Sequence, residues 1–177
     1  MPNKYDVIVV GMGPSSIFCA YELIKLNKFK KVLLIDQGKR VEERYCPIEK
    51  TKKCIHCKPM CNITNGFSGA GAFSDGKLSL YNPEDDEIHV GGNIHKIIGV
   101  PETKRLIDYT DKIYLDFGAD KHLEGTEYKE EIAKINDRAH KEGIRLINIP
   151  IRHLGTEKSH EVYGRLEKWS RKCPKSF

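Results

Sequence analysis

The sequence predicts an α/β fold that begins with a parallel strand–helix–strand unit. Residues 5–10 (YDVIVV) form a short apolar run rich in β-branched residues, which is typical of a strand. A glycine-containing turn at 11–16 (GMGPSS), an amphipathic run at 17–27 and a second apolar run at 31–36 follow directly. A helix between two short apolar strands is the usual way to connect parallel neighbours, so this order predicts a Rossmann-like βαβ core.

The turn at 11–16 has the pattern of a dinucleotide-binding site. Gly11 permits a tight turn out of the first strand, and Gly13 lets the backbone approach a pyrophosphate without a Cβ in the way. The free N–H groups at the start of the helix, at Pro14–Ser16, then face the phosphates with help from the helix dipole. The third glycine of the pattern is replaced by Ser16, whose side chain is small enough to be tolerated. The predicted cofactor-binding residues of this turn are Gly11, Gly13, Pro14, Ser15 and Ser16.

Asp36 closes the second strand and is the expected partner of a ribose. It lies 23 residues after Gly13, close to the usual spacing of about 20 for the acid that binds the adenosine hydroxyls. An acidic residue at this place disfavours NADP. The alternative is a parallel α/β unit with a glycine turn and no ligand.

Composition limits the function classes. With 39% hydrophobic and 31% charged residues in 177, the chain can form a folded core, as one domain with an appendage. The formal charge of +5 comes from lysines that are scattered rather than gathered with aromatic residues, so no nucleic-acid partner is expected. No apolar run is long enough to span a bilayer and no signal sequence is present, which predicts a cytoplasmic protein without a membrane partner.

Beyond residue 36 the sequence predicts mostly helices. A charged helix or turn is expected at 38–44, helices at 101–117, 126–142 and 156–172, and a third strand at 144–149, ended by Pro150. Two regions follow from this. Residues 1–82 form the N-terminal part of a cofactor-binding domain, with a cysteine-rich loop at 45–65, and residues 83–177 form a mostly helical insertion or the start of a substrate domain.

Four of the six cysteines are crowded into one loop with the spacing C-x7-C-x2-C-x3-C. In a reducing compartment such crowding indicates metal or redox chemistry rather than structural disulfides. Three interpretations remain open: a tetrahedral zinc site, an iron–sulfur cluster, and free or redox-active thiols without a metal. Nearby lysines would favour thiolates in all three cases. The candidate metal ligands are Cys46, Cys54, Cys57 and Cys61; Cys19 is expected to be buried in a helix, and Cys173 is given no role.

The segment 68–78 (SGAGAFSDGKL) is too rich in glycine to be an ordinary linker. It suggests a backbone that passes close to a ligand, with Lys77 able to meet a phosphate or an anionic ring. The alternative is a glycine-rich turn that enters a strand.

The chain resembles a group of bacterial FAD-dependent dehydrogenases within the flavoprotein superfamily that has two dinucleotide-binding domains. The resemblance runs from about residue 5 to 169. It is carried by YDVIVVGMGPSS, VLLIDQGKRVEER, CPIEKTKKCIHCKPMC, NITNGFSGAGAFSDGKL and RHLGTEKS, of which the last two are the most specific.

This resemblance implies FAD as the cofactor and oxidation or reduction of a small organic substrate. It implies that Gly11, Gly13 and Ser16 bind the pyrophosphate, that Asp36, followed by Gln37, binds the adenosine ribose, and that Arg40 or Arg44 lies near the phosphates. Gly69, Gly71, Ser74 and Lys77 would follow the cofactor toward the flavin. His153 of the RHLGT block would lie near the substrate or order a loop, and no catalytic acid or base is predicted.

Members of that group are much longer than this chain. The expected fold is therefore incomplete relative to them, and a partner chain that supplies the missing C-terminal half is one expectation. Two other functions stay open at this point. One is a truncated, non-catalytic fragment or one half of a split flavoenzyme, and the other is a four-cysteine iron–sulfur or zinc module for electron transfer.

Overall fold

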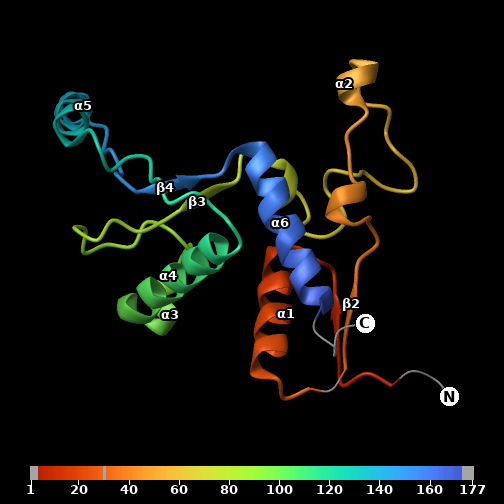
Figure 1. Ribbon diagram of the computed structural model, residues 1–177. Helices are drawn as coiled ribbons and strands as arrows, with labels where there is room; N and C mark the ends of the chain where they lie inside the picture. Colours follow the sequence, from red (N-terminus) through yellow and green to blue (C-terminus); the bar gives the residue numbers. More distant parts are fainter. Residues whose placement is uncertain (1–3, 30, 173–177) are drawn as a thin grey trace. The chain divides into compact units, whose positions relative to one another are not determined.

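A computed structural model describes residues 4–29 and 31–172 of the chain (Figure 1). These residues divide into two units. The first unit contains the chain up to Asp75 and again from Thr156 onward, and the second contains Gly76–Gly155. Cys173, to which the sequence assigned no role, lies outside the described residues.

The predicted strand–helix–strand unit is present in the first unit. Strand β1 (Val7–Val10) and strand β2 (Val32–Ile35) pair in parallel, with Val7 opposite Val32 and Val10 opposite Ile35. Helix α1 (Pro14–Leu26) connects them. The helix begins at a proline, whose fixed φ suits the first helical position, and it ends at Asn27 in the left-handed conformation. Short-range sequence signals therefore account for this unit.

The two faces of this sheet differ strongly. Residues alternate between the faces of a strand, and on one face Val32 is buried and Leu34 lies beside Ile17 of α1. On the other face Ile8 is 54% exposed and Val10 is 75% exposed. Parallel sheets are normally covered on both faces. Here the face that carries Ile8 and Val10 stays open to solvent within the part of the chain that the structure describes.

The last helix completes the core of the first unit. Helix α6 (Gly155–Lys172) buries Val162 and Leu166, and its Trp169 ring lies 4.8 Å from the ring of Tyr21 in α1. The helix predicted at 156–172 is thus confirmed. The division expected at residues 82 and 83 differs from the observed one, because the apolar side of this helix packs on α1 and β2 rather than in the helical insertion.

Short elements make up the rest of the first unit. They are the 3-10 turn η1 (Val41–Glu43), the single-turn helix α2 (Ile48–Thr51) and the 3-10 turn η2 (Gly71–Phe73). The first of these falls within the charged helix or turn expected at 38–44. None of the residues from 45 to 65 is buried, although the loop has a defined path.

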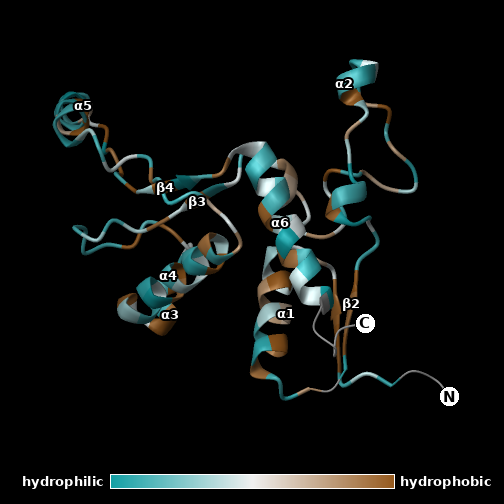
Figure 2. Ribbon diagram, viewed as in Figure 1, coloured by the Kyte–Doolittle hydropathy of each residue, from teal (hydrophilic) through white to brown (hydrophobic). Residues whose placement is uncertain are grey.

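The second unit combines helices with a small antiparallel sheet. Strand β3 (Lys77–Ser79) pairs with strand β4 (Ile151–His153), with Leu78 opposite Arg152. Helix α3 (His95–Ile98), helix α4 (Val100–Asp116) and helix α5 (Lys129–Lys141) lie between them in sequence. Helix α5 buries none of its residues, and Figure 2 shows it as mainly hydrophilic.

The strand predicted at 144–149 is wrong. Those residues have no regular structure, and the strand forms instead just after Pro150. Ile151 exchanges both backbone hydrogen bonds with Glu124, at 2.9 and 3.0 Å, and β4 then pairs with β3. The prediction placed a strand at 144–149, but the residues that pair with β3 are the three that follow Pro150, namely Ile151–His153.

The structure bears out a mixed α/β fold in its coarse form, with helices and two small sheets. No helix among the described residues is both long and apolar enough to cross a membrane. Cys19 lies on the exposed side of α1, so its predicted burial is wrong. The apolar side of α1 is formed by Ile17 and Ala20 instead.

Candidate functional site

The glycine turn between β1 and α1 leaves the backbone open to a ligand. Gly11 has a φ of +83°, which favours glycine, and its N–H donates to the Ile35 carbonyl at 2.7 Å. A Cβ added at Gly11 or at Gly13 would meet no atom within 4 Å. The turn is therefore ordered by the neighbouring strand while open space remains beside its backbone.

Helix α1 begins in this turn without a side-chain cap. Gly13 is the N-cap residue in an extended conformation, and no side chain bonds to the first helical N–H groups. Pro14 and Ser15 are exposed and Ser16 is half-buried. A helix start of this kind presents unsatisfied N–H groups and a partial positive charge.

Asp36 lies beside the turn, at the end of β2. One carboxylate oxygen accepts the Met12 N–H at 2.8 Å, and the other accepts the Gly38 N–H at 2.7 Å. A carboxylate oxygen has two lone pairs, so each oxygen keeps the capacity for a further hydrogen bond. The acid predicted to bind a ribose thus also ties together the turns that follow β1 and β2.

A second glycine-containing segment, residues 65–69, lies against both turns. The Ser68 N–H donates to the Met12 carbonyl at 2.7 Å, and a Cβ on Gly69 would lie 3.8 Å from the Gly13 Cα. On the other side, a Cβ on Gly38 would fall 2.2 Å from the Gly66 nitrogen. The fold thus brings residues 65–69, which overlap the glycine-rich segment 68–78 only at Ser68 and Gly69, against a turn that lies more than 50 residues earlier in the chain.

Arg44 holds this second segment in place. Its side chain is buried, and its guanidinium donates to the carbonyls of Asn62 at 2.7 Å, Ile63 at 2.5 Å, Phe67 at 2.6 Å and Gly69 at 2.6 Å. Burial lowers the pKa of Arg44, partly offset by the negative charges of Asp36, Cys61 and Glu167. The sequence predicted that Arg40 or Arg44 lies near the phosphates. In the structure the Arg44 side chain donates to backbone carbonyls and Arg40 is exposed.

A cavity of about 130 Å³ opens beside Asp36. It lies at the end of β2, with Leu34 and Phe67 on its apolar side. Its polar lining consists of Asp36, Lys39, Arg40, Glu167, Ser170 and Arg171. Sequence reasoning missed the contribution of α6 to this cavity, because an amphipathic helix 130 residues downstream carries no local signal of where it docks.

The other predicted cofactor residues are only partly assembled. Gln37 hydrogen-bonds to Asn65 through their side-chain amides, and the Ser74 hydroxyl donates to the Gly71 carbonyl at 3.1 Å. Gly71 packs on α6, because a Cβ there would lie 3.0 Å from the Tyr163 hydroxyl. Lys77 belongs to β3 of the second unit, so it is not counted among the residues of this site.

Arg152 and His153 of the RHLGT block are part of the second unit's own scaffold. Arg152 is buried and forms a two-pronged ion pair with Asp111, at 2.5 and 2.8 Å. The His153 Nδ1 lies 3.0 Å from a carboxylate oxygen of Glu124. These contacts fix β4 to α4 and to the segment before α5. Arg152 and His153 therefore have a structural role in the second unit.

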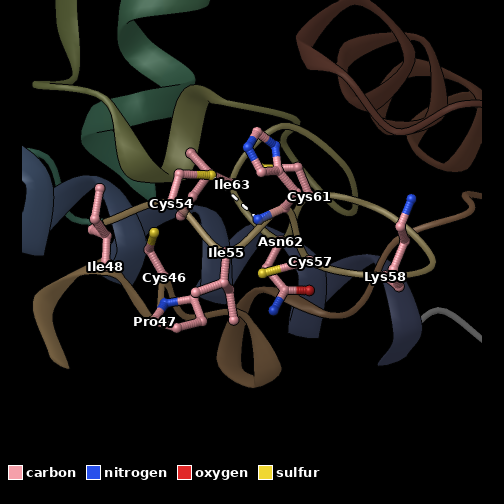
Figure 3. A pocket seen from close by; sticks show the side chains of 11 residues that line it. Cys46, Pro47, Ile48, Cys54, Ile55, Cys57, Lys58, Cys61, Asn62 and Ile63 are labelled. Atoms are coloured by element: carbon pink, nitrogen blue, oxygen red, sulfur yellow. Dashed lines mark hydrogen bonds between the residues drawn. The ribbon is translucent and has the colours of Figure 1, made fainter. Parts of the chain in front are cut away.

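The four clustered cysteines line a second cavity, of about 300 Å³. Figure 3 shows Cys46, Cys54, Cys57 and Cys61 around this space, with Lys58 set apart from the other labelled side chains. His56 also lines it. In the described part of the chain, no three His, Cys, Asp or Glu side chains are arranged so that they could hold one metal ion. The cysteines therefore share a cavity without forming a coordination geometry.

Comparisons with known proteins add little beyond this geometry. No protein-family model matches the chain, and no solved structure matches it with significance. One similar protein is an uncharacterized protein of Clostridium beijerinckii (strain ATCC 51743 / NCIMB 8052), with 39% identity over 76 residues. That match covers 43% of this chain and 14% of the relative, so the chain corresponds to a small part of the longer protein.

Proposed function

We propose that this chain binds FAD at the carboxyl ends of β1 and β2 in a Rossmann-like arrangement and is the N-terminal portion of an FAD-dependent oxidoreductase. The hydrogen bond from the Ser68 N–H to the Met12 carbonyl, together with the closeness of Gly69 to Gly13, carries the proposal. Two glycine-rich segments that meet at the end of a parallel strand pair are suited to a long, flat, anionic ligand that needs close backbone approach.

The open turn and the uncapped helix start fit the pyrophosphate. The N–H groups of Ser15 and Ser16 precede the first intrahelical bond, in which the Ile17 N–H donates to the Gly13 carbonyl at 3.0 Å. Open space beside Gly11 and Gly13 would let phosphate oxygens reach them. The helix dipole adds attraction for negative charge at this point.

Asp36 and the neighbouring cavity fit the adenosine end. The spare lone pairs of its carboxylate would accept the ribose hydroxyls, while Met12 and Gly38 hold the carboxylate in position. Lys39 and Arg40 add positive charge around the same cavity, whereas Arg171 is paired there with Glu167 at 2.8 Å. When bound, FAD supplies the hydride chemistry, and the chain's own residues bind and orient it.

The open face of the β1–β2 sheet supports the further proposal that a partner chain completes this fold. Ile8, Val10 and Ile35 would leave water on contact with further structure, and such burial is favourable by about 25 cal/mol per Å². The substrate is proposed only as a small organic molecule, because no described residue carries the role of catalytic acid or base.

Titration of the purified full chain with FAD tests the proposal. We expect saturable quenching of flavin fluorescence by the wild type, and binding that is about tenfold to a hundredfold weaker in Asp36→Ala, since charge-assisted hydrogen bonds are lost. Asp137→Asn is the matched control, because Asp137 is exposed on α5 in the other unit. Circular dichroism would verify that each variant is folded.

Two results would decide between the functions left open by the sequence. A folded chain that does not bind FAD would refute the proposal and leave a non-catalytic fragment or a four-cysteine module. A chain that binds FAD but transfers no hydride until a second polypeptide is added would support a split enzyme. Equal affinity in the wild type and Asp36→Ala would place the flavin elsewhere.

A further inference from the structure

The cysteine loop contains one sulfur whose surroundings differ from those of its neighbours. Cys61 is exposed, and its sulfur accepts hydrogen bonds from the backbone N–H groups of Ile63 and Thr64 and from the Thr64 hydroxyl. The Thr64 oxygen in turn accepts a hydrogen bond from the Asn65 side chain at 2.9 Å, which orients the hydroxyl toward the sulfur. Three donors around one exposed sulfur orient it and can stabilise the negative charge of an attacking sulfur.

Charge around this sulfur acts in the same direction. The Arg44 guanidinium adds a positive potential at this sulfur. His56 and Lys58 line the same cavity and are the other groups there that can carry positive charge. No carboxylate is among the residues that line it.

The other three cysteines are within the same space. Cys46, Cys54 and Cys57 line the cavity with Cys61 (Figure 3), and the Cys54 sulfur accepts the His56 N–H at 3.5 Å. No residue of the surrounding loop is buried, so a small molecule can reach the sulfurs from solvent. A nucleophilic thiolate with further thiols close by is the arrangement needed for disulfide exchange.

We propose that this loop is a thiol–disulfide exchange site in which Cys61 attacks low-molecular-weight disulfides and a second cysteine of the cavity completes the reaction. The inference does not depend on FAD binding. The ligand class follows from the small, open, carboxylate-free cavity, which suits a compact and often anionic disulfide.

The reaction balances without any other oxidant. The Cys61 thiolate attacks one sulfur of R–S–S–R, so a protein–S–S–R bond forms, the R–S–S–R bond breaks and one thiolate leaves. A second cavity thiolate then attacks the Cys61 sulfur and releases the other R group as a thiolate. Two protein thiols are oxidised to one disulfide, the small disulfide is reduced to two thiols, and the two protons pass from the protein thiols to the products through water.

Reaction of the reduced full chain with oxidised glutathione tests this proposal. We expect two molecules of glutathione to be released per chain, and mass spectrometry to show the loss of two hydrogens with no adduct retained. Cys61→Ser should lose the fast reaction, at least about tenfold in rate. Cys19→Ser is the matched control, because Cys19 is also exposed in the first unit and should leave the rate unchanged.

Variants of Thr64 separate thiolate activation from mere access. Thr64→Val should slow the reaction about threefold to tenfold, because one donor to the sulfur is lost. Thr64→Ser keeps the hydroxyl and should restore the rate. Single serine variants at Cys46, Cys54 and Cys57 should include one that stops at the glutathione adduct.

Three outcomes would overturn the proposal. One is a Cys61→Ser variant that reacts as fast as the wild type. Another is a wild-type chain that retains a stable glutathione adduct and forms no internal disulfide. The third is stoichiometric zinc or iron in anaerobically purified protein that protects all four thiols, which would make the loop a metal site.

Discussion

Each unit contains one buried arginine, and the two arginines are bound in different ways. In the first unit Arg44 donates to four backbone carbonyls and to no carboxylate. In the second unit Arg152 forms an ion pair with Asp111 and donates to the carbonyls of Asp120 and His122. The first arrangement fixes the path of a loop, whereas the second joins a strand to a helix.

This difference indicates what each unit is built to hold. The Arg44 contacts order residues 62–69, which lie against the glycine turn of the proposed cofactor site. The Arg152 contacts order the scaffold around β4, and none of the cofactor residues placed in the first unit takes part. The sole tryptophan, Trp169, lies in the first unit, so its fluorescence can report that unit separately from the helices α4 and α5.

The largest expected effect is the loss of Arg44. Arg44→Leu removes the donors of four carbonyls in the first unit, and each buried carbonyl left without a partner costs about 1–3 kcal/mol, so we expect a loss of at least about 3 kcal/mol. Urea unfolding followed by Trp169 fluorescence should show this loss in the free energy of unfolding. Arg40→Leu, at an exposed position, should change it by less than about 0.5 kcal/mol. Equal effects of the two variants would contradict the role given to Arg44.

Asp111→Ala should destabilise the second unit by about 3 kcal/mol, since Arg152 would remain buried without its carboxylate. Circular dichroism should report the lost helix, while the Trp169 transition stays near its wild-type midpoint. Asp116→Ala is the control, because its ion pair with Lys112 is exposed and weak. A parallel shift of both signals would mean that the two units unfold together.

Gly38→Ala and Gly13→Ala should separate stability from cofactor binding. The Gly38 variant places a Cβ 2.2 Å from the Gly66 nitrogen, so we expect a loss of about 1–3 kcal/mol in stability. The Gly13 variant places its Cβ in open space and should unfold like the wild type, yet bind FAD more weakly. Unchanged FAD binding by a folded Gly13→Ala would place the pyrophosphate away from this turn.

Acid should weaken the second unit before the first. The Glu87 N–H, followed by His89, lowers the pKa of Asp85 below its ordinary value. A depressed carboxyl pKa in the folded state stabilises it above the ordinary pKa, and that contribution is lost as the pH falls through the folded value. The carbonyl contacts of Arg44 contain no titrating partner. Thermal unfolding at decreasing pH should therefore shift the dichroism signal before Trp169 fluorescence, and Asp85→Asn should reduce the difference.

The smallest effect on stability should come from the open sheet face. Val10→Thr keeps a β-branched side chain at an exposed strand position, so the free energy of unfolding should change by less than about 0.5 kcal/mol. Self-association at high concentration should fall, because exposed apolar surface is reduced. Light scattering would measure the self-association, with Ala139→Ser on α5 as the control. Unchanged self-association would mean that this sheet face does not drive contact between molecules.

Much of the local structure could be predicted because its causes are local. Short apolar runs, the glycine turn and an amphipathic run predicted β1, α1 and β2 within a few residues of their bounds. Helical periodicity likewise predicted α4, α5 and α6. The prediction of a strand at 144–149 was wrong because a strand requires a pairing partner, and the residues of the segment do not show where that partner lies.

By itself, the sequence determined the glycine turn, the acid at the end of β2 and the crowding of four cysteines, since each depends on residue type and short spacing. Only the tertiary structure decided that Arg44 binds carbonyls, that α6 closes the first unit, and that residues 65–69 lie against Gly13. These are contacts between distant segments. They follow from which surfaces exclude water together and which buried polar groups must be paired, and no local pattern encodes that choice.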